Sequence, residues 1–374
     1  MTTKRVLVTG ARAPSTLELI KNLAKDGCEV YAVDSVPFAL GFYTKSVKAY
    51  EVVPPAKQET DHFIHKLIEV IQRYQIDLLI PTCEEIFYIA KYKEELEKYT
   101  SVFCENLERL TKLHHKYNFI ELAKSFGLPV PSTILCTEKE RLVEGLNKVA
   151  KPVFSRFSTN VINLNKQKLD KIKVDGDHPW VVQDYIEGRE FCSYSIAKEG
   201  KLLAHTVYES KFHAGDGATI QFQSVEHEAI NNWVATFIEN YHFSGQIAFD
   251  FRVSPSGEVF AIECNPRLTS GVHLFRERSL VQAFLGQRQN IIAPQDKPMK
   301  MTLPLVWFLF PNIKKNGVRA TGRALLHGQD IVWDQQDKQP FWKQVGALYH
   351  FWRVAKRHHI STMEATTYDI SWDG

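Results

Sequence analysis

The sequence has few of the features that mark a specialised class of protein. No Cys-x-x-Cys pair occurs among its six cysteines, which stand at positions 28, 83, 104, 136, 192 and 264. This scatter argues against a cysteine-bound zinc ion and favours a reducing compartment. No apolar run reaches membrane-spanning length, and the apolar segment after Arg5 is too short for the core of a signal peptide. We therefore expect a cytoplasmic protein.

An excess of one charge is also missing. Lys+Arg number 46 and Asp+Glu number 43, which leaves a net charge of +3, so the overall charge predicts no nucleic-acid partner. Internal repeats and low-complexity segments are absent as well. At 374 residues, with 44% hydrophobic and 24% charged residues, the chain is typical of a globular protein with two or three domains.

Glycine is scarce where a dinucleotide-binding loop would need it. The first hundred residues alternate strands and helices, which predicts a parallel, doubly wound, Rossmann-like sheet. The expected strands are 5–9, 29–34, 76–81 and 102–104, and the expected helices are 16–26, 61–74 and 84–99. The loop after the first strand holds only Gly10, without the later glycines that let a backbone approach a pyrophosphate. Binding of NAD is therefore the less favoured interpretation of this lobe.

Acidic and amide side chains, in contrast, are concentrated in one predicted hairpin. Residues 245–251 and 259–267 are two alternating apolar runs on either side of Pro255-Ser256-Gly257, which indicates antiparallel strands. Asp250, Glu263 and Asn265 would then reach one rim. Such hard oxygen ligands suit Mg²⁺ or Mn²⁺, whose coordination is usually completed by substrate phosphates, and Arg267 follows as a candidate phosphoryl-stabilising charge.

This hairpin resembles the metal-binding end of ATP-grasp enzymes. The Glu-Cys-Asn-Pro-Arg run that begins at Glu263 is closest in style to the carbamoyl-phosphate-synthase-like group. The resemblance covers about residues 1–285 and implies an α/β chain in which a Rossmann-like pre-ATP-grasp domain (1–105) precedes a two-lobed α+β grasp fold. The two lobes are expected at 106–186 and 187–285, and a C-terminal extension at 286–374 is only loosely matched.

The same resemblance implies a set of nucleotide-binding residues. Lys116 and Lys151 would contact the phosphates, although His115 stands where the family more often has Asp. The loop 154–160 would be the flap over the triphosphate, although it contains no glycine. In the hinge, Gln183 would face the adenine amino group, the Asp184 carbonyl and the Ile186 N–H would bind the adenine edge, and Glu190 would hold the ribose. The full set is Lys116, Lys151, Ser155, Ser158, Gln183, Asp184, Ile186 and Glu190.

Weaker candidates face the second substrate. They are Arg12 and Glu84 in the N-terminal lobe, Lys211 and His213 in a glycine-containing loop, and His273 and Arg276 after the hairpin. Each has a structural alternative, because solvated charges, hairpin tips and acids at helix N-termini are common.

The resemblance implies a carboxylate–amine or amino-acid ligase that uses ATP and Mg²⁺, forms an acyl phosphate, and releases ADP and phosphate. Arg267 and Asn265 are its expected catalytic residues. A bicarbonate-activating carboxylase and an NAD-dependent oxidoreductase remain as alternatives. The expected partners are a small-molecule carboxylate and an amine, and a homodimer is left open.

The C-terminal extension contains a predicted amphipathic helix. Aromatic and aliphatic residues recur at helical spacing from Phe341 to Trp352, opposite basic residues such as Lys343 and Arg357. A basic amphipathic helix of this kind either docks on the body of the protein or lies on a membrane surface, and we favour docking.

Overall fold

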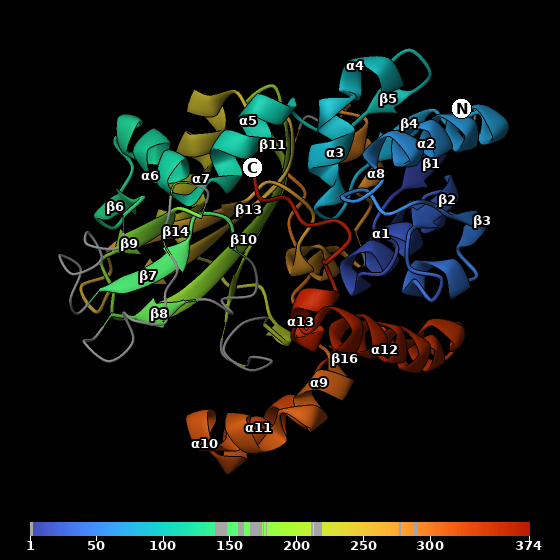
Figure 1. Ribbon diagram of the computed structural model, residues 1–374. Coiled ribbons are helices and arrows are strands. Elements are labelled where there is room, and N and C mark those ends of the chain that lie inside the picture. Colours follow the sequence, from blue (N-terminus) through green and yellow to red (C-terminus); the bar gives the residue numbers. More distant parts are fainter. Residues whose placement is uncertain are drawn as a thin grey trace.

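The computed structural model of the chain describes residues 3–138, 148–155, 161–164, 174, 176, 178–210, 212, 219–276, 278–287 and 290–374. It is an α/β structure with a five-stranded parallel sheet and two four-stranded antiparallel sheets, as the sequence predicted (Figure 1). None of the helices in these ranges is long and apolar enough to cross a membrane.

The N-terminal lobe is a five-stranded parallel sheet in the order β3-β2-β1-β4-β5. Its strands are β1 (Arg5–Val8), β2 (Glu29–Asp34), β3 (Val47–Val52), β4 (Leu78–Ile80) and β5 (Ser101–Val102). Its helices are α1 (Pro14–Lys25), α2 (Thr60–Tyr74), α3 (Glu85–Lys91), α4 (Lys93–Leu96) and the 3-10 helix η1 (Leu40–Tyr43). The sequence missed the edge strand β3, because its alternation of half-buried and exposed residues carries no continuous apolar run. The helix expected at 84–99 is interrupted at Tyr92.

Two four-stranded antiparallel sheets form the grasp. The first has the order β6-β9-β7-β8, with β6 (Thr133–Cys136), β7 (Val149–Pro152), β8 (Ile162–Asn163) and β9 (Trp180–Gln183). The second has the order β11-β10-β13-β14, with β10 (Arg189–Lys198), β11 (Lys201–Glu209), β13 (Gly245–Val253) and β14 (Val259–Asn265). The hairpin predicted around Pro255 is therefore confirmed as β13 and β14.

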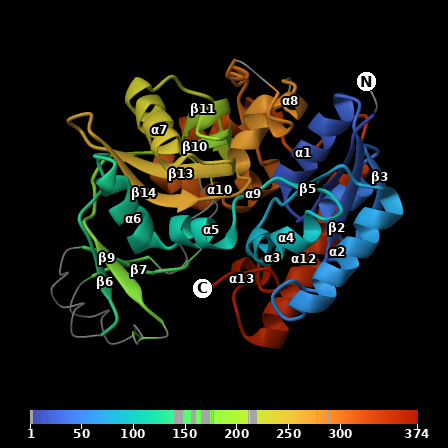
Figure 2. The ribbon, with the colours of Figure 1, turned by 90° about the horizontal axis from the view of Figure 1, so that it is seen from above.

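Three helices cover the second sheet, as seen from above in Figure 2. They are α5 (Leu107–His114), α6 (Lys116–Ser125) and α7 (Glu228–Tyr241), of which the sequence did not predict α7. Phe119 of α6, Trp233 and Phe237 of α7 and Phe249 of β13 form an aromatic cluster between helices and sheet. Burying such large side chains contributes roughly 1.5–3 kcal/mol each, so this cluster sets β14 and the start of α6 side by side.

The N-terminal lobe packs directly on the second grasp sheet. Leu19 and Ile20 of α1 share one core with Tyr194 of β10 and with Val272 of the 3-10 helix η4 (Ser270–Phe275). At the carboxyl end of β4, the Pro81 carbonyl accepts a hydrogen bond from Gln246 of β13 at 3.1 Å. The strand ends of the parallel sheet therefore face the hairpin.

The C-terminal extension runs along one side of the molecule (Figure 1). It follows α8 (Val281–Phe284), and its helices are α9 (Thr302–Trp307), α10 (Leu309–Asn316), α11 (Val318–Leu326), α12 (Gln339–His358) and α13 (Thr362–Ala365). A small sheet joins β12 (Gln221–Phe222), β15 (Met299–Lys300) and β16 (Gln329–Asp330). The predicted amphipathic helix is confirmed as α12, which docks beside η1 through Ala347, Phe351 and Ala355, while Trp342, Tyr349 and Trp352 stay exposed.

Candidate functional site

The β13–β14 hairpin places the predicted metal ligands on one face. Asp250 pairs with Glu263, and Ala248 pairs with Asn265. Because side chains alternate along a strand, Asp250, Glu263 and Asn265 point the same way. The Asn265 Nδ2 donates to an Asp250 carboxylate oxygen at 3.4 Å. The three residues are therefore brought together, as expected.

Two buried lysines approach this face from the first lobe and from α6. Lys116 begins α6, and its Nζ lies 3.7 Å from a Glu263 carboxylate oxygen and donates to the Ser155 carbonyl at 3.2 Å. Lys151 on β7 donates to the Ile262 carbonyl at 3.4 Å. Both side chains are buried. A buried ammonium group needs anionic partners, so the structure unites both lysines with the hairpin.

His115 explains how α6 begins without the aspartate that the family more often has. Its Nδ1 accepts a hydrogen bond from the Asn118 N–H at 3.3 Å, so it caps the helix N-terminus. Burial lowers the pKa of His115, which keeps the neutral imidazole available as an acceptor. The departure therefore preserves the cap that positions Lys116.

Two ionisable groups of this site have pKa values shifted toward their neutral forms. Burial, followed by repulsion from Glu263, raises the pKa of Asp250 to about 6. Burial lowers the pKa of Lys151 to about 8, against the attraction of Glu263. Acids that resist ionisation and a base that releases its proton early are typical of sites that await a charged ligand.

The donor set fits a magnesium ion that is completed by phosphates. No group of three or more His, Cys, Asp or Glu side chains able to hold a metal occurs in the described ranges. The hairpin instead offers two carboxylates and one amide, all hard oxygen donors. A divalent cation between Asp250 and Glu263 would relieve the repulsion that raises the pKa of Asp250.

Arg267 connects the hairpin with the N-terminal lobe. Its guanidinium donates to the Asn265 side-chain oxygen at 3.3 Å and lies 3.8 Å from a carboxylate oxygen of Glu84, at the N-terminus of α3. Glu84 also accepts the Trp372 N–H at 3.2 Å. Arg267 therefore lies where the hairpin, the parallel sheet and the C-terminal segment meet, and Glu84 lies with it.

The predicted hinge lies between β9 and β10. Gln183 is buried and donates to the Thr133 hydroxyl at 3.0 Å, and the Asp184 N–H donates to the Ser132 carbonyl at 2.9 Å. Gly188 has a φ of +148°, and a Cβ there would lie 2.0 Å from the Val253 carbonyl oxygen. The turn that carries Ile186 past the hairpin therefore requires glycine at position 188.

Glu190 follows the hinge on β10. Its carboxylate pairs with Arg252 of β13 at 2.6 Å and remains partly exposed. The carboxylate of Glu190 is therefore partly accessible, and the ribose contact stays a prediction. Of the remaining nucleotide candidates, Ser155 is buried beside Lys116. Ser158, Lys211 and His213 lie outside the described residues.

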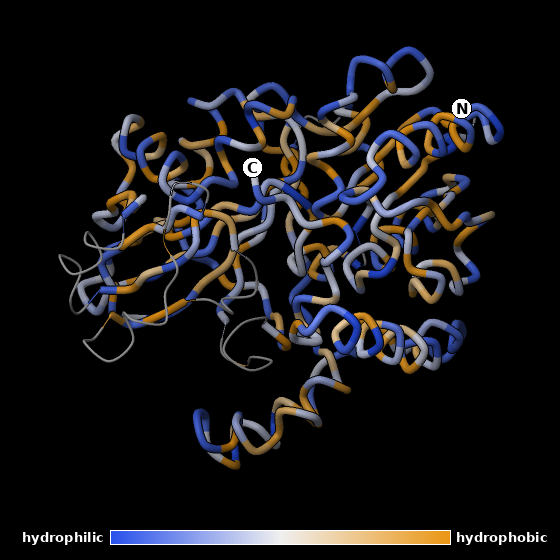
Figure 3. The backbone as a smooth tube through the Cα atoms, in the orientation of Figure 1, coloured by the Kyte–Doolittle hydropathy of each residue, from blue (hydrophilic) through white to orange (hydrophobic). Residues whose placement is uncertain are grey.

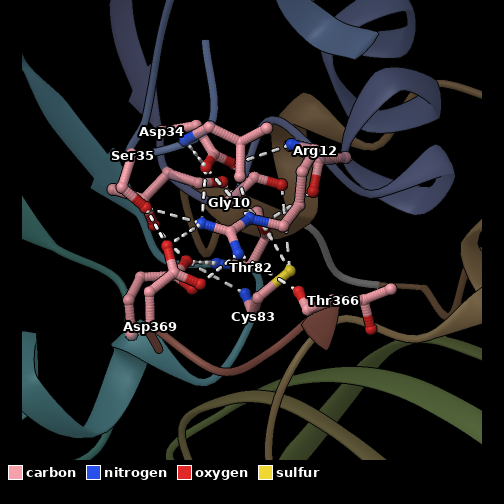
Figure 4. A network of polar contacts seen from close by, with 12 residues as sticks. Gly10, Arg12, Asp34, Ser35, Thr82, Cys83, Thr366 and Asp369 are labelled. Atoms are coloured by element: carbon pink, nitrogen blue, oxygen red, sulfur yellow. Dashed lines mark hydrogen bonds and ion pairs between the residues drawn. The ribbon is translucent and has the colours of Figure 1, made fainter. Parts of the chain in front are cut away.

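Arg12 is placed differently from the substrate-side position that the sequence suggested. Figure 4 shows its buried guanidinium surrounded by Asp34, Ser35 and Asp369. It pairs with Asp34 at 2.6 Å and with Asp369 at 2.5 Å, and donates to the Thr366 carbonyl at 3.1 Å. Burial lowers the pKa of Arg12, but the two carboxylates raise it overall. Arg12 therefore binds the C-terminal segment, and a substrate contact of this residue stays an untested prediction.

His273 and Arg276 are also committed to structural contacts. The His273 Nδ1 lies 3.2 Å from a Glu18 oxygen, and Arg276 pairs with the same carboxylate. Arg276 further donates to the Asp330 and Ile331 carbonyls at 2.9 and 2.8 Å. Glu18 belongs to α1, so these contacts attach η4 to the N-terminal lobe. Both residues therefore make structural contacts, and a role of either toward the acceptor substrate stays an untested prediction.

Sequence reasoning missed two contributors to the site. Cys192 of β10 is the cross-strand partner of Asp250, and its hydrogen bond lowers the pKa of that carboxylate against the stronger effect of burial. The C-terminal segment also returns to the strand ends, where the Ser371 carbonyl accepts from the Tyr88 hydroxyl at 2.6 Å. The first could have been found from strand pairing, whereas no sequence signal announces the second.

Comparison with known proteins agrees with this geometry. Residues 113–271 match the family model of an ATP-grasp domain. The carbamoyl phosphate synthase large chain of Methanosarcina acetivorans is 20% identical over 286 residues, which are 67% of this chain and 25% of that one. This chain therefore spans about a quarter of the length of that relative.

Solved structures share the fold across most of the chain. The N5-carboxyaminoimidazole synthetase of Staphylococcus aureus has a TM-score of 0.65 at 14% identity, with 84% of this chain and 89% of that chain covered. An L-amino acid ligase of Bacillus licheniformis has a TM-score of 0.61 at 15% identity, with 76% of each chain covered. The family match shows that residues 113–271 carry an ATP-grasp domain, and the solved structures share the fold of the chain.

Proposed function

We propose that this protein is an ATP- and Mg²⁺-dependent ligase that joins a small carboxylate to an amine or amino acid, with release of ADP and phosphate. The observation that carries the proposal is a cluster to which four elements, α6, β7, β13 and β14, contribute Lys116, Lys151, Asp250, Glu263 and Asn265. The relative named as an amino acid ligase supports the carbon–nitrogen bond.

The reaction follows from the charges of the cluster. A substrate carboxylate oxygen attacks the γ-phosphorus of ATP, the bond between the γ-phosphorus and the β–γ bridging oxygen breaks, and ADP leaves. The amine then attacks the acyl carbon, and phosphate leaves with the electron pair of the broken bond while the amine loses a proton. Lys116 and Lys151 neutralise the phosphates that would repel the incoming carboxylate, and Arg267 faces the phosphoryl group in transfer.

Metal binding belongs to the hairpin in this proposal. Asp250, Glu263 and Asn265 would hold Mg²⁺ or Mn²⁺, which when bound supplies Lewis acidity to the phosphates. The protein residues themselves fix the position of the triphosphate between α6 and β14. Gln183, Asp184, Ile186 and Glu190 bind adenine and ribose at the hinge, with Ser155 and Ser158 in the loop beyond β7.

The proposed domain division follows the sheets. A pre-ATP-grasp domain covers 1–105, the two grasp lobes cover 106–186 and 187–285, and the extension covers 286–374. A cytoplasmic location is part of the proposal, and it is supported by the six free cysteines, since unpaired thiols persist in a reducing compartment.

Product analysis tests the proposed function directly. The purified protein is incubated with Mg·ATP and pools of carboxylates and amines, and ADP, AMP and phosphate are quantified. We expect ADP and phosphate in equal amounts with one acid–amine pair, and a hydroxamate when hydroxylamine replaces the amine. AMP and pyrophosphate as stoichiometric products would overturn the mechanism.

Bicarbonate activation is the second candidate. A neighbour named for a carboxyamino compound favours it, and its signature would be ADP release that depends on bicarbonate. An NAD-dependent reaction has less support, because Asp34 stands at the end of β2, where an acid would hold the ribose of a dinucleotide, and already accepts the Arg12 N–H at 2.7 Å and pairs with its guanidinium. Mg·ATP should raise the unfolding temperature, and NAD should leave it unchanged.

A further inference from the structure

The C-terminal extension exposes large apolar side chains on several consecutive helices. In the arm formed by α9, α10 and α11, Trp307 is 84% exposed and Phe310 is 80% exposed, and Val306, Val318 and Leu326 are exposed as well. Figure 1 shows this arm projecting from the body of the protein, and the tube in Figure 3 alternates apolar and polar residues along it. Exposed apolar groups gathered in this way usually mark an interaction surface.

Helix α12 carries a second apolar stripe beside its docked face. The docked side consists of Ala347, Phe351 and Ala355. The residues at helical spacing on another side of the helix are Trp342, Val345, Leu348, Tyr349 and Trp352, and all are exposed, with Val345 at 65% and Trp342 at 63%. The aromatic face that predicted this helix therefore remains uncovered by the rest of the described chain.

Charge identifies the partner that fits both surfaces. The four helices α9 to α12 contain no Asp or Glu, and their charged residues are Lys314, Lys315, Arg319, Arg323, Lys343, Arg353, Lys356 and Arg357. On α12, Arg353 and Arg357 flank the exposed apolar stripe. Tryptophan and tyrosine next to lysine and arginine are the combination that settles at the interface of an anionic bilayer, because the rings enter the headgroup region while the cations attract lipid phosphates.

We propose that the arm (α9–α11) and the exposed stripe of α12 dock this protein on the surface of an anionic lipid bilayer. The helices lie on the membrane plane, and the catalytic lobes remain in water. A second copy of the chain fits these helices less well, since it would bring basic residues against basic residues while burying them. A nucleic acid would use the cations but leave the aliphatic residues Val306, Val345 and Leu348 without a partner.

Vesicle sedimentation of the full chain tests the proposal. The probes are vesicles of phosphatidylcholine alone and of phosphatidylcholine mixed with phosphatidylglycerol, at low and at physiological salt. We expect binding to the mixed vesicles only, and stronger binding at low salt. Trp307→Ser with Phe310→Ser, and separately Trp342→Ser with Trp352→Ser, should each weaken binding by about tenfold or more.

Charge variants and matched controls complete the design. Lys314→Glu with Lys356→Glu should weaken binding by more than about tenfold at low salt, since each cation near the surface contributes about fivefold. The controls Tyr99→Ser and Lys91→Glu change exposed residues of the N-terminal lobe and should bind as the unchanged protein does. The altered side chains lie on the surface, and circular dichroism checks that each variant is folded.

Two outcomes would overturn the proposal. Equal sedimentation with neutral and anionic vesicles, or no sedimentation with either, excludes an anionic membrane surface. A homodimer in sedimentation velocity that the Trp307→Ser and Phe310→Ser changes dissociate would assign the face to a second copy. Neither result bears on ADP release, so this inference and the proposed ligase function fail independently.

Discussion

Two buried ionic clusters lie within this protein, and they differ in how their charges are balanced. Around Arg12, two carboxylates and a backbone carbonyl saturate one guanidinium. Around Glu263, two lysines face two carboxylates, yet the pKa of Asp250 is raised to about 6 and that of Lys151 is lowered to about 8. The first cluster is complete without a ligand, whereas burial in the second disfavours the charged form on both sides.

Whether its charges are balanced distinguishes a structural cluster from a candidate binding site better than residue type does. An arginine near a strand end and a lysine inside a strand are both candidates for anion binding by sequence. The guanidinium of Arg12 donates to Asp34 and Asp369, and the second contact attaches the C-terminal segment to the N-terminal lobe. Burying the charged groups of the second cluster is unfavourable, and a bound cation and polyphosphate would offset this. For that reason we propose that ATP binds there.

The strongest test of the second cluster is Glu263→Gln. The change keeps the side-chain shape but removes an anionic ligand and the partner of Lys116. We expect ADP release to fall by at least about a hundredfold at saturating Mg²⁺, while circular dichroism stays unchanged. Glu258→Gln, in the exposed turn of the same hairpin, is the matched control and should keep full activity. Full activity of the Glu263 variant would contradict the metal assignment.

Asp34→Asn tests the cluster around Arg12. It leaves the buried Arg12 with one carboxylate in place of two, and breaking a buried pair costs about 3–5 kcal/mol. Urea unfolding should show a loss of that size in the free energy of unfolding. Asp296→Asn, at an exposed position, should change stability by less than about 0.5 kcal/mol. Equal stabilities would mean that the Arg12 network does not hold the C-terminal segment.

Lys151→Met should weaken ATP binding. The variant loses a charge-assisted contact worth roughly 1.5–3 kcal/mol, which corresponds to a drop in affinity of about ten- to a hundredfold. Titration calorimetry with Mg·ATP measures the change. Lys124→Met alters an exposed lysine on α6 and should bind ATP normally. If both variants bind equally well, Lys151 belongs with the structural lysines.

The pH dependence of ATP binding should have an alkaline limb. The folded-state pKa of Lys151 is about 8, so the ammonium is charged below that pH and neutral above it. Affinity for Mg·ATP should therefore fall as the pH rises beyond about 8. Lys151→Arg should remove this limb even where it weakens binding overall, since a guanidinium stays charged. An alkaline limb that persists in this variant would point to another group.

Asp250→Asn should have the smallest effect. Without ligand it should stabilise the protein, whereas Asp34→Asn should destabilise it. The folded-state pKa of Asp250 is raised to about 6, so its ionisation begins to cost stability as the pH rises above the ordinary value of 3.8 and costs the full amount above about 6. Removing the charge should raise the free energy of unfolding at pH 7 by about 1–2 kcal/mol, while stabilisation by Mg·ATP is lost. A destabilised variant would place Asp250 in a satisfied network like that of Arg12.

Much of the fold could be predicted because it depends on local pattern. The parallel sheet follows from short apolar runs alternating with helices, and the β13–β14 hairpin follows from alternation around Pro255. The edge strand β3 and helix α7 were missed. Edge strands are weakly patterned. Helix α7 was missed although its buried residues recur at helical spacing from Ile230 to Tyr241 and His227 caps its N-terminus.

For the site, sequence motifs named the residues but could not tell which of them converge. Family spacing indicated Lys116, Lys151, Asp250, Glu263 and Asn265 as nucleotide and metal ligands, and the fold brings these five together. The same kind of reasoning also selected Arg12, His273 and Arg276. Those three are bound by Asp369 and Glu18, partners more than two hundred and fifty positions away along the chain.

The sequence by itself determined the α/β fold class, most of the strands and helices of the N-terminal lobe, and the chemistry of the hairpin. Alternation and residue type act over short distances, so they can be read from the sequence alone. Only the tertiary structure decided which charges are satisfied, which face of α12 is docked, and that the last residues return to Arg12 and Glu84. Those features depend on contacts between distant segments, and a charged side chain shows its role only once its partners are known.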